Sequence, residues 1–81
     1  MFTPEGRTLL EIVVAERNRA GVTQRELARR LGKPQPWVSF VENGVRRLDL
    51  LEFCAVIRAL DGDPELVFEA FVSRLPAHFE I

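Results

Sequence analysis

The chain has 81 residues, 47% of them hydrophobic, and a formal net charge of −1, which predicts one small folded domain and excludes a disordered tail. No stretch approaches the ~20 apolar residues of a membrane-spanning helix, and the first residues lack the basic and apolar blocks of a signal peptide. The single cysteine excludes an internal disulfide and fits a reducing compartment, so we expect a cytoplasmic domain with no membrane partner.

The first predicted helix begins at Thr3 and Pro4, because threonine caps a helix and proline suits its first position. It runs to about Arg19, and Gly21 ends it. Its apolar stripe repeats every three or four residues, as expected for a helix with one buried face, and Arg17 falls on the same spacing. The stripe comprises Leu9, Leu10, Ile12, Val13 and Val14.

A second helix is predicted from Gln24 to Leu31. Thr23 and Glu26 have the spacing of a capping box, in which threonine accepts a backbone N–H bond and the glutamate reaches back. Gly32 ends the helix, since glycine adopts a positive φ without steric cost. The predicted outer face carries Arg25, Arg29 and Arg30.

The third helix is predicted from Gln35 to Glu42. Pro34 and Pro36 would break a helix interior. In the first turn, however, backbone N–H groups have no partner within the helix, so a proline without an N–H loses no hydrogen bond there. Asn43 and Gly44 form a stop signal. The inner edge of this helix is formed by Val38 and Val41.

Asp49 and Glu52 begin a fourth helix, which is apolar nearly all round and is therefore expected to be central. A fifth starts at Asp63 and Pro64 and runs to about Arg74. We predict an all-α fold of five short helices, with a helix-turn-helix domain at 1–75 and a C-terminal tail at 76–81.

Positive charge is concentrated between Arg17 and Arg47. This span holds eight cations and two anions, a local charge of +6, so the rest of the chain carries −7. A basic block in an acidic chain predicts one face that meets a polyanion.

Helices two and three are short and joined by a turn with glycine, so they can cross steeply and prop the third helix outward. Such a helix fits the major groove of DNA. Its predicted base-reading residues are Gln35, Pro36, Ser39 and Phe40. Gln35 suits an adenine edge, and Phe40 can contact a thymine methyl group.

The segment GVTQRELARRLGKPQPWVSFVENGVRRLDLLEF resembles the helix-turn-helix core of the phage lambda repressor and Cro-like family, also called the XRE class. This resemblance implies a bacterial or phage transcription regulator that binds double-stranded DNA, as a homodimer on a near-palindromic operator. The matching residues are Thr23-Gln24, Glu26-Leu27-Ala28, Leu31-Gly32, Gln35, Val38-Ser39 and Glu42-Asn43-Gly44.

The resemblance also implies roles for particular side chains. Gln24 is expected to contact a phosphate and to buttress Gln35 at a base-reading position. The chain departs from the family pattern at Pro36, where a polar residue is common, and at Phe40, where a related branch often has lysine. Together with the basic flank, the expected phosphate contacts are Gln24, Arg25, Lys33, Trp37, Asn43, Arg46 and Arg47.

Two aromatic regions leave alternatives open. Trp37 either faces a partner or packs over the loop after the third helix with its N–H bonded nearby. The fifth helix and the tail carry more apolar surface than one small core absorbs, so we expect a homodimer interface there. Its predicted residues are Phe68, Phe71, Val72 and Phe79.

A protein-interaction module on the same fold, such as an antitoxin or an adaptor, is the alternative function, because Pro36, Trp37 and Phe40 also suit a protein interface. An enzyme is not expected, since one cysteine, one histidine and no tyrosine provide no nucleophile with a base and an orienting group. No cofactor, metal or small-molecule substrate is predicted.

Overall fold

The computed structural model describes residues 3–80, so the predictions that fall on Met1, Phe2 and Ile81 lie outside the described residues. Within 3–80 the chain is all-helical and has no strand, which confirms the predicted fold class. The five helices are α1 (Pro4–Arg19), α2 (Gln24–Leu31), α3 (Gln35–Glu42), α4 (Leu50–Ala59) and α5 (Pro64–Ser73). The predicted bounds of the first three are confirmed.

Side chains cap most of the helix starts. The hydroxyl of Thr3 accepts a hydrogen bond from the Gly6 N–H at 3.0 Å. Asp49 and Glu52 form a complete capping box at α4, in which each side chain accepts from the backbone N–H of the other. These local bonds satisfy amides that have no partner within the helix.

The capping box predicted at α2 forms only in part. The Thr23 hydroxyl accepts from the Glu26 N–H at 3.0 Å, as predicted. The Glu26 carboxylate, however, accepts from Arg29 and Arg30 instead of reaching back to Thr23. A guanidinium makes a stronger hydrogen bond to a carboxylate than a neutral amide does, so Glu26 bonds to the two arginines and not to the Thr23 N–H.

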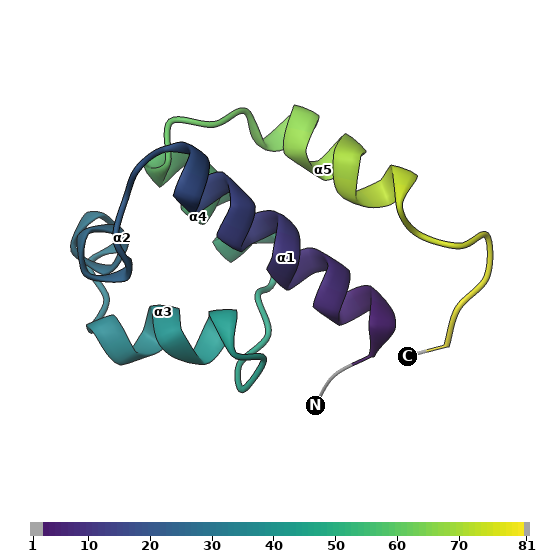
Figure 1. Cartoon of the computed structure of the whole chain (residues 1–81), viewed down its shortest axis with the longest axis horizontal. Coiled ribbons are helices and arrows are strands. Elements are labelled where there is room, and N and C mark those ends of the chain that lie inside the picture. Colours follow the sequence, from purple (N-terminus) through teal and green to yellow (C-terminus); the bar gives the residue numbers. More distant parts are fainter. Residues whose placement is uncertain (1–2, 81) are drawn as a thin grey trace.

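The core lies between α1 and α4, with α2 and α3 on one side and α5 on the other (Figure 1). Buried residues from every helix meet there, among them Val13 of α1, Leu27 of α2, Val38 of α3, Ile57 of α4 and Val67 of α5. This arrangement leaves α3 and α5 at opposite sides of the molecule.

The helix α4 is central, as predicted, but the apolar residues of its first turn are not buried. Leu50 and Leu51 are 67% and 83% exposed, whereas Phe53, Val56 and Ile57 are buried. The first turn extends past the core, where no described helix covers it. No helix within residues 3–80 combines the length and apolar character needed to traverse a bilayer.

Candidate nucleic-acid interface

The turn between α2 and α3 depends on Gly32. Its φ of 67° lies in the left-handed region, which glycine adopts without the clash that a Cβ atom causes. The Lys33 N–H then bonds to the Ala28 carbonyl at 3.0 Å and closes the end of α2. Ala28 is buried, so its small side chain occupies the core below this turn.

A network of charged and amide side chains holds α3 against α1 and α2. Arg17 donates to both oxygens of Glu42, from Nε at 2.7 Å and from Nη2 at 3.0 Å. Gln24 Nε2 donates to the same carboxylate at 2.9 Å. Gln35 Nε2 donates to Gln24 Oε1 at 3.1 Å, which confirms the predicted buttress.

This network is largely removed from water. The side chains of Arg17 and Glu42 are 14% and 6% exposed. Arg17 also donates to the Val22 carbonyl at 2.9 Å, so its charge is well satisfied. A planar guanidinium with two parallel bonds to one carboxylate fixes orientation as well as distance, so the network sets the angle at which α3 stands.

The sequence motif gave no role to Arg17 and treated Glu42 only as a family match. One signal was available: Arg17 continues the apolar stripe of the first helix, and a cation on a buried stripe requires a partner. The identity of that partner, 25 residues away, could not be read from spacing.

The predicted base-reading residues lie on or beside the outward face of α3. Gln35 and Pro36 are exposed, and Phe40 is 49% exposed, so these three are brought together at the surface. Ser39 is half-buried, and its hydroxyl accepts a bond from Asn43 Nδ2 at 3.2 Å. Ser39 is therefore placed to support the end of α3 through Asn43, and it is less accessible to a base than the three exposed residues.

Trp37 packs over the loop after α3, as one of the two alternatives predicted. Arg46 from that loop lies over the indole ring at 5.1 Å from the centroid, and Lys33 lies over it at 5.6 Å. Both distances are within cation–π range. The expected hydrogen bond of the indole N–H is wrong: Nε1 is buried and has no partner among the described residues.

Because its N–H is buried, Trp37 cannot donate to a phosphate in this conformation. Its ring instead holds two cations, Lys33 and Arg46. Lys33 and Arg46 thus lie beside α3, over its Trp37 ring.

The sequence overstated the free positive charge between residues 17 and 47. Five of its eight cations are engaged by carboxylates: Arg17 by Glu42, Arg19 by Glu16, Arg29 and Arg30 by Glu26, and Arg46 by Glu52. The remaining three, Arg25, Lys33 and Arg47, form no ion pair within residues 3–80. The local charge of +6 does not show these ion pairs, because it counts charges without saying which side chains meet in space.

Two of these carboxylates have lowered pKa values. Hydrogen bonds from Arg29, and then Arg30, lower the pKa of Glu26 from 4.5 to about 2. A hydrogen bond from Arg46 lowers the pKa of Glu52. The same bonds raise the pKa of Arg29 and Arg46, so all four groups stay charged at neutral pH.

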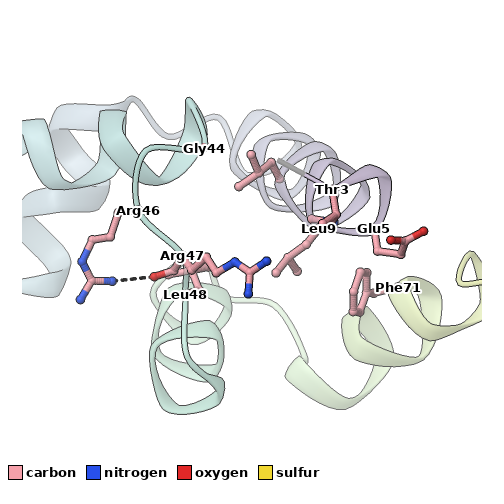
Figure 2. A pocket seen from close by; sticks show the side chains of 10 residues that line it. Thr3, Glu5, Leu9, Gly44, Arg46, Arg47, Leu48 and Phe71 are labelled. Carbon is pink, nitrogen blue, oxygen red and sulfur yellow. Dashed lines mark hydrogen bonds between the residues drawn. The ribbon is translucent and has the colours of Figure 1, made fainter. Parts of the chain in front are cut away.

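Arg46 and Arg47 point in opposite directions from the α3–α4 loop (Figure 2). Arg46 donates to the Glu52 carboxylate at 2.8 Å and stays near Trp37. Arg47 points toward Leu9 and Phe71 and lines a cavity of about 180 Å³ between α1, the α3–α4 loop and α5, which Arg46 also lines. The Arg47 guanidinium therefore extends away from the Trp37 ring, where Arg46 is held.

Three of the predicted dimer residues, Phe68, Phe71 and Val72, belong to α5, which lies across the molecule from α3 (Figure 1). Phe68, Val72 and Phe79 are 45%, 44% and 45% exposed, while Phe71 is half-buried. The ring of Phe68 meets Phe53 edge-on at 6.2 Å between centroids. Sequence reasoning missed one neighbour: the exposed Leu50 lines the same shallow groove as Phe68 and Phe71.

No other cluster competes with this interface as a site for chemistry. Within the described part of the chain, no three His, Cys, Asp or Glu side chains gather where they could bind a metal ion. Cys54 carries a free thiol and is half-buried against the core.

Comparisons with known proteins agree with this geometry. A sequence model of a family described as helix-turn-helix matches residues 14–67, which contain α2, α3 and α4. The solved structure of an XRE-family like protein from Pseudomonas syringae pv. tomato str. DC3000 is similar, with a TM-score of 0.83 and 40% sequence identity. The similarity covers 89% of this chain and 88% of that chain. No curated protein sequence matches the chain significantly.

Proposed function

The chain belongs to the XRE family of helix-turn-helix proteins, which are DNA-binding regulators and not enzymes, and we propose that it binds a near-palindromic operator as a homodimer. The family predicted from the motif is thereby confirmed. In the proposed complex, α3 enters the major groove, and the basic flank contacts phosphates on either side. Its place of action is the cytoplasm, where bacterial DNA lies.

One observation carries the proposed DNA contact: the outward face of α3 is exposed while its back is braced. Gln35 and Pro36 at the start of α3 face solvent, and Gln24 holds Gln35 by a 3.1 Å hydrogen bond. A preorganised side chain loses less entropy when it bonds to a base edge. Lys33, over the Trp37 ring, supplies positive charge beside this face, and Arg46, which is paired with Glu52, lies over the same ring.

The proposed homodimer rests on the apolar surface of α5. Phe68 and Val72 are nearly half exposed on the side of the molecule away from α3, so both surfaces can be occupied at once. A two-fold dimer would present two copies of α3 about 34 Å apart, one turn of duplex.

Selection of bound duplexes from a random pool tests the proposal, carried out at low and moderate salt. Near-palindromic sites are expected, and Gln35→Ala should relax base preference at one position by about 1–3 kcal/mol. Ser73→Ala, on exposed α5, is the control that should leave preference unchanged. If Gln35→Ala also leaves it unchanged, α3 is not the helix that reads bases.

The second candidate is a protein-interaction module, such as an antitoxin or an adaptor. It is favoured by Phe40 and Val45, which are 49% and 70% exposed beside each other at the end of α3. Salt separates the two functions, because DNA binding falls steeply between low and moderate ionic strength, whereas an apolar protein interface responds little.

A further inference from the structure

The outward edge of α3 is apolar. Pro36 and Phe40 are four residues apart, which places them on one face of a helix. Both are exposed, Phe40 to 49%. Val38 and Val41 are buried on the opposite face, so the core is completed without this edge.

The polar groups beside this edge each make one hydrogen bond within the fold, and Gln35 keeps its Oε1 and its second N–H for a base. Gln35 Nε2 donates to Gln24, and the Ser39 hydroxyl accepts from Asn43. The residues of α3, QPWVSFVE, include no arginine or lysine. The commonest guanine contact, a bidentate Arg or Lys, is therefore absent from α3. What the edge offers to a base is apolar surface.

The surroundings favour DNA over a protein as the partner of this edge. Lys33 and Arg46 lie on Trp37 next to it, at 5.6 and 5.1 Å from the ring centroid. Arg25, on the exposed face of α2, is a further cation without an ion pair in the described chain. A small apolar edge framed by cations matches base edges lying between two phosphate backbones.

In the major groove, the apolar group that bases present is the C5-methyl group of thymine. 5-Methylcytosine carries the same methyl at the same ring position and differs from thymine at C4, with an amino group in place of an oxygen. Distinguishing the two requires a hydrogen-bonding partner, and Pro36 and Phe40 provide none.

We propose, on the premise that α3 reads the major groove, that Pro36 and Phe40 recognise the pyrimidine C5-methyl group itself, in thymine and 5-methylcytosine alike. Cytosine methylation then strengthens binding at positions under this edge. The protein responds to the methyl group and is indifferent to which of the two bases carries it.

The test uses the full chain and the duplex that it selects from a random pool. Each thymine is replaced in turn by uracil, cytosine and 5-methylcytosine, with adenine or guanine opposite as pairing requires. The methyl effect is measured as thymine against uracil and as 5-methylcytosine against cytosine, so the opposing purine stays constant. Under the apolar edge, each methyl is expected to tighten binding roughly fourfold, the worth of one buried methyl-sized group.

Phe40→Ala should abolish the methyl effect at one position and Pro36→Ala at a neighbouring one. Phe40→Leu should retain part of it, because an apolar contact remains. The control is Leu66→Ala, which trims a 64% exposed side chain on α5 and should leave every methyl effect intact. Circular dichroism verifies that each variant is folded.

The outcomes separate this inference from the proposed function. If selection succeeds but thymine and uracil duplexes bind equally at every position, methyl recognition is wrong and DNA binding stands. A methyl effect that survives both Phe40→Ala and Pro36→Ala also overturns it. If no duplex is enriched, the proposed function fails and this inference fails with it.

Discussion

The two sides of the domain are held by different kinds of contact. On the side that faces DNA in our proposal, charged hydrogen bonds tie α3 to α1 and α2, with Arg17 and Glu42 at their centre. On the other side, α5 is held mainly by apolar contacts such as that of Phe68 with Phe53. Only Val67 of α5 is fully buried.

This difference matters because the two kinds of contact do different things. Charged hydrogen bonds are directional and set the angle of a helix, which suits one that must match a groove. Apolar contacts are non-directional, and the free energy they contribute scales with the buried area. The exposed apolar face of α5 can therefore gain further stabilisation by packing against a second copy of the chain. We therefore predict that a substitution in the charged network of α3 changes the stability of the domain, whereas a substitution on the exposed face of α5 changes self-association.

The largest effect is expected from Glu42→Ala. It leaves the mostly buried Arg17 guanidinium without its carboxylate partner and should cost about 3–5 kcal/mol in the free energy of unfolding, measured by urea denaturation. Glu11→Ala is the matched control, because Glu11 is 56% exposed and accepts a bond from Arg74, the residue that follows α5, at 3.1 Å. That exposed pair should cost less than about 1 kcal/mol. Equal losses would show that α3 and α5 are not held differently.

Val72→Asp should weaken self-association with little effect on folding, since Val72 is 44% exposed. Placing like charges across a two-fold interface should raise the dimer dissociation constant about thirtyfold, roughly 2 kcal/mol. Sedimentation at micromolar concentration measures it. Ala70→Asp adds the same charge at another exposed position of α5 and serves as the control. A wild-type chain that stays monomeric both free and on DNA would remove this surface as an interface.

A smaller effect is expected on the salt dependence of DNA binding. Arg25→Ala removes an unpaired cation from α2 and should reduce the slope of log affinity against log salt by about 0.9, one phosphate contact. Arg19 is held by Glu16 at 2.9 Å at the end of α1, so Arg19→Ala should leave the slope nearly unchanged. Equal changes in both would mean that overall charge, and not the α2–α3 face, controls binding.

The smallest effect is acid sensitivity. Because the pKa of Glu26 is lowered from 4.5 to about 2, the folded chain binds fewer protons than the unfolded chain between these values. The stability that Glu26 contributes is present above pH 4.5 and is lost as the pH falls toward 2. Glu52, whose pKa is also lowered, acts in the same direction. Urea midpoints between pH 5 and 2.5 should decline less steeply in Glu26→Gln; an unchanged slope would contradict the pairing.

Most of the helix boundaries were predictable because they depend on neighbours in sequence. Thr3, Thr23 and Asp49 cap the helices where their side chains reach the first free amides. Gly32 marks the end of α2 because its backbone conformation excludes most other residues. The outward residues of α3 followed from helical spacing once Val38 and Val41 were assigned to the core.

The pairing of charges was not predictable in the same way. Glu26 and Arg29 are three residues apart and could have been paired from spacing, but the partners Arg17 and Glu42 come from different helices. The exposure of Leu50 has the same origin, since its place in an apolar run does not reveal where the core ends.

By itself, the sequence determined five helices, four of them capped by a side chain, a glycine turn between the second and third, and a family motif, because each depends on residues a few positions apart. Only the tertiary structure decided which arginines remain free for a polyanion, how Gln24 and Glu42 brace α3, and which apolar side chains stay in water. Those properties depend on distances between helices, which arise only when the whole core has packed.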